Sequence, residues 1–259
     1  MIRVLFAAAN PADTPPLRLG EELREIRSKL RASSGFQDFD LRSIWAVRAD
    51  DLLQEMNDFR PNILHLSGHG SREGLLALED AQGYAAPVSP ATLSALFANF
   101  SRWLNLVVLN ACSSAQQAAA ILDAIGVVVA MRASVGDEAA LTFAASFYRG
   151  LGFGRSVRDA FDQGLISLRL QGIGEEDIPT LLHRDDIKPD RLTLAESLQR
   201  AAQKRRADDP IVPRRIEPSR TRSVVYRRPC AVGHIRSGCL HRCIRADSAT
   251  SACYQETRC

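Results

Sequence analysis

Hydrophobic residues in the first 190 positions occur either as short unbroken runs or at helical spacing. Unbroken runs of strand length lie at 2–9, 63–67, 106–111 and 126–131, and the stretch 39–47 alternates enough for a further strand. Between these runs, apolar residues recur every three or four positions, which gives a helix one apolar face. We therefore expect helices at 19–30, 50–59, 89–100, directly after 112, 137–150 and 155–170.

The order of these elements predicts an α/β fold. Strands that are apolar along their whole length are buried on both faces, which is typical of a parallel sheet with helices on either side. A small hairpin is expected around LLALED and Gly83. The periodic pattern ends near residue 190, and one more helix is expected at 193–206.

Charge is distributed unevenly along the chain. The 259 residues are 46% hydrophobic and 24% charged, which is ordinary for a soluble globular protein, and the formal net charge is +3. Residues 204–259 contain 13 Lys and Arg against 5 Asp and Glu, whereas residues 1–203 contain 20 against 25. We therefore expect a mildly acidic domain at 1–190, and at 191–259 a helix followed by a basic, disordered tail.

The tail also contains residue types that bind zinc, although their spacing matches no common zinc finger: Cys230, His234, Cys239, His241 and Cys243. Disorder is the favoured interpretation of this region. Metal binding, and weak charge-driven contact with nucleic acid or an anionic surface, stay open as alternatives. Nucleic acid is otherwise not expected as a partner.

Cysteine usage and hydropathy indicate the compartment. Cys112 is the single cysteine before residue 230, which argues against a disulfide framework and fits a reducing environment. No apolar stretch approaches the roughly 20 residues that a membrane span needs. The opening MIRVLFAAANPA resembles a signal peptide only faintly, because its apolar part is short. A cytoplasmic location without membrane contact is therefore expected.

Two of the apolar strands end in a reactive side chain among small residues. ILHLSGHG at 63–70 ends with His69 between two glycines, and LVVLNACSS at 106–114 contains Cys112. The carboxyl ends of parallel strands carry the working groups of open α/β sheets. Because neighbouring strands lie ~4.8 Å apart, the two side chains are expected to meet. A thiol needs a base to become a nucleophile, so the pair predicts cysteine catalysis.

The residues around this pair fit the same chemistry. A developing oxyanion needs preorganised N–H donors, and the amides of Gly70 and Cys112 are the candidates. The N-terminus of the helix after Cys112 would favour a thiolate, and Ser113 and Ser114 are expected to cap that helix.

Plainer interpretations of the same residues stay open. Cys112 alone would more often be a small buried hydrophobe. His65 and His69 lie four residues apart, as metal ligands can, but no third ligand stands out. His65 is therefore expected to pack within its strand, and no metal or cofactor is expected.

The motifs HLSGHG and VVLNAC together resemble the CHAT domain, a caspase-like group of clan CD cysteine peptidases found widely in bacteria. The stretches 6–26, 44–52 and 131–161 are similar to flanking parts of such domains, so the resemblance covers about residues 1–185. It implies a caspase-like three-layer sandwich with a mostly parallel central sheet. It also implies hydrolysis of peptide bonds through a thioester, with His69 as general base and Cys112 as nucleophile. Backbone groups, rather than a third acidic residue, often orient the histidine in this clan.

The resemblance extends to partners and specificity. Relatives commonly act in bacterial defence or self-killing systems and are fused to sensor domains; no such fusion is visible here, so a regulatory sensor in trans is expected beside a protein or peptide substrate. Clan members select the residue before the scissile bond through a charged pocket. Asp137 would attract a basic side chain there, and Arg132 an acidic one. For Asp137, the N-cap of the helix that begins there is the favoured role, and the choice between a basic and an acidic substrate stays open.

Two rival functions remain. The first is a catalytically silent caspase-like module that serves only as a docking scaffold. The second is a nucleotide-processing α/β domain, but no strand is followed by a glycine-rich phosphate loop. The segment GLGFG at 150–154 is expected to link two helices.

Overall fold

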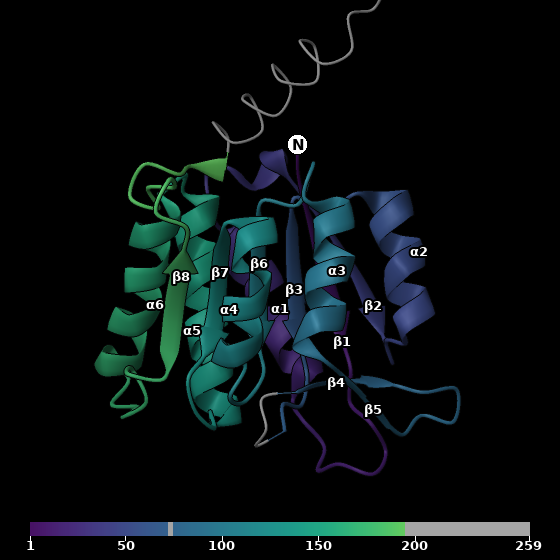
Figure 1. Ribbon diagram of the computed structural model, residues 1–259. Helices are drawn as coiled ribbons and strands as arrows, with labels where there is room; N and C mark the ends of the chain where they lie inside the picture. Colours follow the sequence, from purple (N-terminus) through teal and green to yellow (C-terminus); the bar gives the residue numbers. More distant parts are fainter. Residues whose placement is uncertain (72–74, 195–259) are drawn as a thin grey trace, which may run out of the picture. The chain divides into compact units, whose positions relative to one another are not determined.

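Six strands form the central sheet of the structure, a computed structural model that describes residues 1–71 and 75–194. Their order across the sheet is β2-β1-β3-β6-β7-β8 (Figure 1). The first five in this order run parallel, and β8 runs antiparallel to β7. Their bounds are β1 Ile2–Ala8, β2 Phe39–Trp45, β3 Ile63–Ser67, β6 Leu106–Asn110, β7 Val127–Met131 and β8 Pro179–His183.

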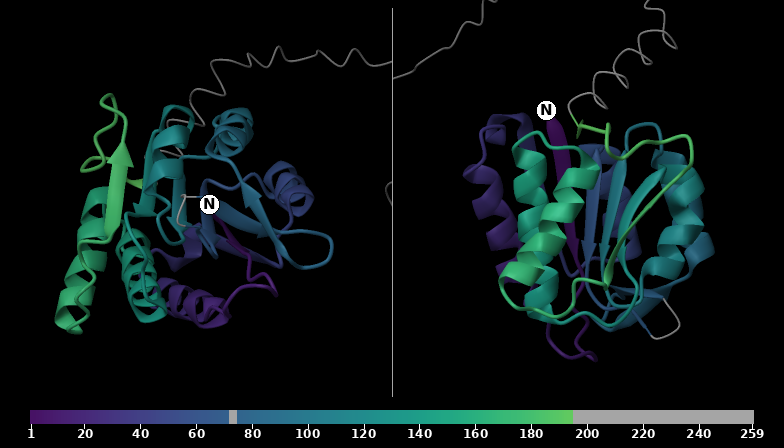
Figure 2. Two further views of the ribbon diagram at one scale, coloured as in Figure 1. Left: turned by 60° about the horizontal axis from the view of Figure 1, so that its bottom comes forward. Right: turned by 90° about the vertical axis from the view of Figure 1, so that its left-hand side faces the viewer.

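Helices cover both faces of this sheet, which Figure 2 (right) shows nearly edge on between its two helical layers. Side chains at alternate positions of each strand enter separate cores, so that Val4 and Phe6 pack on one side while Leu5 and Ala7 pack on the other. The first core includes α1 (Leu19–Arg31), α5 (Asp137–Gly152) and α6 (Val157–Leu170). The second includes α2 (Ala49–Phe59), α3 (Pro90–Phe100) and α4 (Ala115–Ile125). The predicted three-layer α/β sandwich is confirmed.

Smaller elements complete the described chain. A short 3₁₀ helix, η1, spans Phe36–Asp38. The predicted hairpin is present as β4 (Leu76–Glu79) paired with β5 (Ala85–Val88). No helix in the described parts of the chain is both long and apolar enough to cross a membrane.

Two features differ from the sequence-based expectation. The edge strand β8 was not anticipated, because PTLLH is short and follows a polar loop. The GLGFG segment is not simply a linker, since α5 continues through Gly152. A Cβ on Gly150 would lie 2.8 Å from the Cα of Ala160, so this glycine lets α5 and α6 approach closely.

The predicted domain boundary at 190 stays a prediction. Leu192 and Leu194 pack with the core on the α1 side, and the amide of Val157 bonds the carbonyl of Leu192. The helix expected at 193–206 lies almost wholly outside the described residues. The tail and its zinc-binding residue types lie entirely outside them.

The register of the two middle strands positions the site. β3 pairs with β6 in parallel, with Ser67 opposite Asn110. His69 and Cys112 each follow their strand's last residue by two positions. The chain therefore brings both to the same edge of the sheet, as the strand-end pattern predicted.

Candidate active site

A small pocket lies at the carboxyl ends of β3 and β6, beside the first turns of α1 and α5. His69 and Cys112 both line it. Its other polar lining residues include Arg18, Glu22, Asn110 and Asp137. The two candidate catalytic residues therefore share one solvent-open pocket.

A backbone carbonyl orients the imidazole of His69. Its Nε2 lies 2.8 Å from the carbonyl oxygen of Pro15, in the loop between β1 and α1. A carbonyl oxygen only accepts hydrogen bonds, so Nε2 carries the hydrogen of the neutral ring. The other nitrogen, Nδ1, then has a free lone pair and can accept a proton. The contact with Pro15 could not be predicted from local sequence, because 54 residues separate it from His69.

The sulfur of Cys112 rests against the segment that follows β7. The hydroxyl of Ser134 lies 3.5 Å from Sγ, and the amide of Val135 donates to Sγ at 3.5 Å. The thiol is free and half-buried. Among the described contacts, none is a hydrogen bond between Cys112 and His69.

The two candidate oxyanion amides come from backbone segments in close contact. A Cβ on Gly70 would lie 1.9 Å from the carbonyl oxygen of Cys112, so only glycine fits there. In residues 1–71 and 75–194, no backbone carbonyl takes the N–H of Gly70 or of Cys112. Among the described residues, therefore, no backbone acceptor competes with a ligand for these two N–H donors.

The turn after Cys112 departs from the expected capping. Ser113 has a left-handed backbone (φ 55°), and its amide bonds the carbonyl of Ala133. Ser114 occupies the N-cap position of α4 but makes no side-chain cap. Its hydroxyl instead donates to the carbonyl of Leu109 and accepts from the amide of Met131. Ser114 thus joins the ends of β6 and β7 beside the turn at Cys112 and Ser113.

The two candidate specificity residues lie in different surroundings. Asp137 is the first residue of α5 and lines the pocket, while Gly136 holds the N-cap position. Arg132 is exposed and is not among the pocket's lining residues. Asp137 therefore does not cap α5; it is half-buried in the lining of the pocket, where Arg18 is a lining residue as well.

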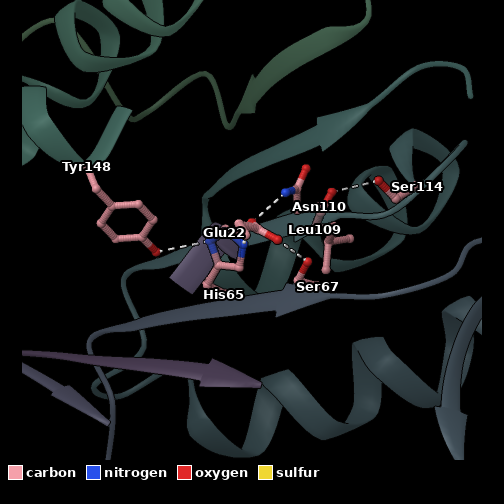
Figure 3. A network of polar contacts seen from close by, with 7 residues as sticks. All are labelled: Glu22, His65, Ser67, Leu109, Asn110, Ser114 and Tyr148. Atoms are coloured by element: carbon pink, nitrogen blue, oxygen red, sulfur yellow. Dashed lines mark hydrogen bonds and ion pairs between the residues drawn. The ribbon is translucent and has the colours of Figure 1, made fainter. Parts of the chain in front are cut away.

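A buried polar network lies on the α1 side of the sheet and reaches the pocket (Figure 3). The carboxylate of Glu22, 4% exposed, accepts from His65 Nε2 at 2.8 Å, from the Ser67 hydroxyl at 2.6 Å and from the Asn110 amide at 2.6 Å. The other ring nitrogen of His65 lies 3.3 Å from the hydroxyl of Tyr148. The ring of His65 also stacks on Phe6, with centroids 5.0 Å apart. As expected, His65 packs within its strand.

Tyr148 keeps its proton in this network. Burial, together with the negative charge of Glu22, raises the pKa of Tyr148 well above its ordinary value. Its hydroxyl can therefore donate to Nδ1 of His65, which leaves Nε2 of the same ring to donate to Glu22.

This network was not predicted from the sequence, although one signal for it was present. Glu22 lies three residues after Leu19 and one before Leu23, inside the apolar stripe of α1. A charged residue in such a stripe is buried only when hydrogen-bonded partners surround it. Those partners come from other strands and from α5, so the sequence spacing alone did not identify them.

Comparison with known proteins agrees with this geometry. The CHAT domain family matches residues 6–174, more than half of the chain. A Roc-COR-CHAT protease from an unknown prokaryotic organism is 25% identical over 198 residues, which are 71% of this chain and 19% of the relative. A probable protease from Gillisia limnaea is 25% identical over 150 residues, 57% of this chain and 26% of the relative. The chain thus spans about a fifth to a quarter of these relatives.

The fold is also found among solved structures. A secreted C11 cysteine protease from Bacteroides thetaiotaomicron, crystallised with an irreversible peptide inhibitor, superposes with a TM-score of 0.52 at 10% identity. The match covers 71% of this chain and 66% of the other. The family match over residues 6–174, together with the three-layer fold and the two strand-end motifs, shows that the chain belongs to the CHAT domain family.

Proposed function

We propose that the chain is a cysteine endopeptidase in which His69 and Cys112 act as a dyad. The observation that carries this proposal is the shared pocket, in which Pro15 leaves Nδ1 of His69 as the free base. Nδ1 takes the thiol proton, and the sulfur attacks the peptide carbonyl. The peptide C–N bond breaks, the leaving amine receives the proton, and water then hydrolyses the thioester.

The amides of Gly70 and Cys112 are proposed as the oxyanion donors. Their support is the free N–H of each within the described chain and the close packing of Gly70 on Cys112. Such donors stabilise charge that develops only in the transition state.

The substrate and setting follow from family membership. Proteases of this kind act on protein or peptide substrates, which Asp137 is proposed to bind at the rim of the pocket. Arg132, exposed after β7, stays a candidate for contact with an acidic group outside the pocket. A regulatory sensor in trans, a cytoplasmic location and a role in bacterial defence remain predictions.

Cleavage of a peptide library tests the dyad. The wild-type chain is expected to cleave some members, whereas Cys112→Ala should reduce turnover by about 10³-fold or more. His69→Gln should produce a comparable loss. Cys259→Ala, which removes a different thiol, is the matched control and should retain full activity. Unchanged turnover in Cys112→Ala would remove this residue from the mechanism.

A second candidate is the catalytically silent docking module. It is favoured by the resting contacts of Sγ, which go to Ser134 and Val135 rather than to His69. This alternative predicts no cleavage and the same rate of Cys112 alkylation with or without the His69 imidazole.

A further inference from the structure

We infer that the hairpin formed by β4 and β5 positions both candidate catalytic side chains, with Asp13 and Gln117 as the positioning residues that attach it to its neighbours. This inference rests on the proposed peptidase function, because the two residues act through His69 and Cys112. In Figure 1 the hairpin lies at the bottom of the view, beside the purple loop between β1 and α1. Hydrogen bonds join it to three segments of the site.

The first attachment is to the segment that contains His69. The amide of Ala77, in β4, donates to the carbonyl of His69 at 3.0 Å. The next residue, Gly70, forms an antiparallel β-bridge with Leu76. Backbone pairing therefore holds this segment against β4, as one strand of a sheet holds its neighbour.

The second attachment is to the loop between β1 and α1, in which the carbonyl of Pro15 orients the His69 ring. The amide of Ala85, in β5, donates to the carboxylate of Asp13 at 2.9 Å. The amide of Ala12 donates to the carbonyl of Gly83, in the turn of the hairpin, at 2.8 Å. The hairpin thus contacts both the histidine segment and the loop that selects its tautomer.

These hydrogen bonds matter because core packing does not hold this part of the loop. Asp13 and Pro15 are both exposed, and only two residues separate their positions in the chain. One further bond to the hairpin, from the amide of Asn10 to the carboxylate of Glu79, lies at the start of the loop. Asp13 is therefore the side chain through which the hairpin sets the position of the Pro15 carbonyl.

The third attachment is to α4, which begins three residues after Cys112. Gln117 donates from Nε2 to the carbonyl of Val88, the last residue of β5, at 3.0 Å. Val88 pairs with Leu76, which in turn forms the bridge with Gly70. A continuous series of contacts therefore runs from the helix after the cysteine, across both strands of the hairpin, to the histidine segment.

Gln117 makes this contact in a place that does not suit a polar side chain. It is 0% exposed, and its helix neighbours Ala118 and Ile121 belong to the core between the sheet and α2, α3 and α4. Its Oε1 is buried without a partner among the described residues. A buried acceptor without a donor destabilises a fold. A residue that packing alone does not favour is typical of a functional site, where position matters more than stability.

Neither positioning residue is among those that line the pocket beside Cys112. Asp13 and Gln117 therefore do not contact a substrate there. Their effect is on where Nδ1 of His69 lies relative to the sulfur, so their loss should lower kcat and leave KM unchanged.

Variants of Asp13 test the contact with the loop. Asp13→Ala removes the acceptor of the Ala85 amide and should lower kcat on a cleaved peptide by about tenfold. Asp13→Asn keeps an oxygen acceptor and should restore kcat. Asp185→Ala, which removes an exposed acid after β8 at the opposite edge of the sheet, is the matched control and should change neither constant. Wild-type kcat in Asp13→Ala would overturn the inference.

Gln117→Met tests the contact with α4. Methionine has a similar length and no amide, so the variant loses the bond to Val88 together with the unpartnered oxygen. Its melting temperature should stay close to that of the wild type, because these two effects oppose each other, while kcat falls by about tenfold. Gln116→Met, at the exposed neighbouring position, is the control. If Gln117→Met fails to fold, the Asp13 variants still decide.

The double variant tests whether the two residues act through one hairpin. After either attachment is lost, the hairpin no longer relates the two segments, so losing the other should add little. Asp13→Ala with Gln117→Met should therefore lower kcat by about the same tenfold as each single variant. A loss of about 100-fold, the product of two independent effects, would overturn the shared role of the hairpin.

Alkylation of Cys112 by iodoacetamide, followed by mass mapping, separates failure of this inference from failure of the proposed function. The rate should fall several-fold in Asp13→Ala and recover in Asp13→Asn. A rate that falls in His69→Gln but not in Asp13→Ala would overturn the inference and leave the dyad intact. Alkylation that depends on both residues, without cleavage of any peptide, would support the inference and contradict the peptidase.

Discussion

At the scale of residues, the proposed chemistry depends on backbone groups that set the tautomer of His69 and the position of Cys112. The carbonyl of Pro15 selects the tautomer of His69, and the small size of Gly70 allows its segment to lie against Cys112. Neither contact involves a charged side chain. A substitution that moves the backbone here should therefore impair the site without removing any catalytic group.

Gly70→Ala is expected to lower kcat/KM by about 100-fold, because its Cβ would overlap the Cys112 carbonyl and displace the nucleophile turn. Steady-state kinetics on a cleaved peptide measure this effect. Gly20→Ala is the control, since a Cβ there has open space, and it should leave activity unchanged. Wild-type kinetics in Gly70→Ala would show that the close packing is not needed.

Tyr148 makes stability depend on pH. Because burial and the Glu22 charge raise the pKa of Tyr148 in the folded state, its contribution is complete below the unfolded pKa of about 10 and is lost as the pH rises further. Tyr148→Phe should be about 1 kcal/mol less stable at pH 7, since the bond to His65 is lost.

The same variant should lose less stability than the wild type between pH 9 and pH 11. Urea unfolding of both proteins at each pH measures how the free energy of unfolding changes with pH. The same change in the two proteins would mean that Tyr148 has the same pKa in the folded and unfolded states.

At the scale of elements, the site depends on how β3, β6 and β7 end together. The register of Ser67 with Asn110 aligns the two motifs, and Ser114 joins β6 to β7 by two hydrogen bonds. The 133–135 segment after β7 then contacts both the sulfur of Cys112 and the amide of Ser113. The turn at Cys112 and Ser113 is therefore positioned by the ends of several strands and not by one loop.

Ser114→Ala should lower the free energy of unfolding by about 1–3 kcal/mol, because it leaves the buried amide of Met131 and the carbonyl of Leu109 without this partner. Thermal unfolding measures the loss, and peptide kinetics should show a lower kcat. Ser101→Ala is the control: its hydroxyl is exposed and bonds one carbonyl of its own turn, so little change is expected.

The sequence predicted the elements whose pattern is local and missed those that depend on distant partners. Five strands and six helices were anticipated because unbroken apolar runs and helical spacing are visible in short windows. β8 was missed because an antiparallel edge strand of five residues has no distinctive pattern. At the candidate site, the strand-end motifs predicted His69 and Cys112, whereas the positions of Pro15 and Glu22 depend on contacts made only in the folded chain.

At the scale of the whole molecule, the packed core continues past the predicted boundary at 190. Leu194 is 5% exposed within the core on the α1 side, and Leu192 packs against the same core. The described residues all fall within one compact unit. Chain length near this boundary should therefore affect stability.

A chain that ends at residue 190 should be about 2 kcal/mol or more less stable than one that ends at 211, because two leucines leave the core. Thermal unfolding of the two chains measures the difference. Equal melting temperatures would place the edge of the domain at or before 190.

The most direct test of the central claim is covalent labelling with a peptide electrophile followed by mass mapping. Peptides ending in a chloromethyl ketone, with arginine or leucine at the last position, should label Cys112 and none of the five later cysteines. Labelling should slow by about 100-fold or more in His69→Gln. Labelling elsewhere, or an unchanged rate at Cys112 without the imidazole, would contradict the account.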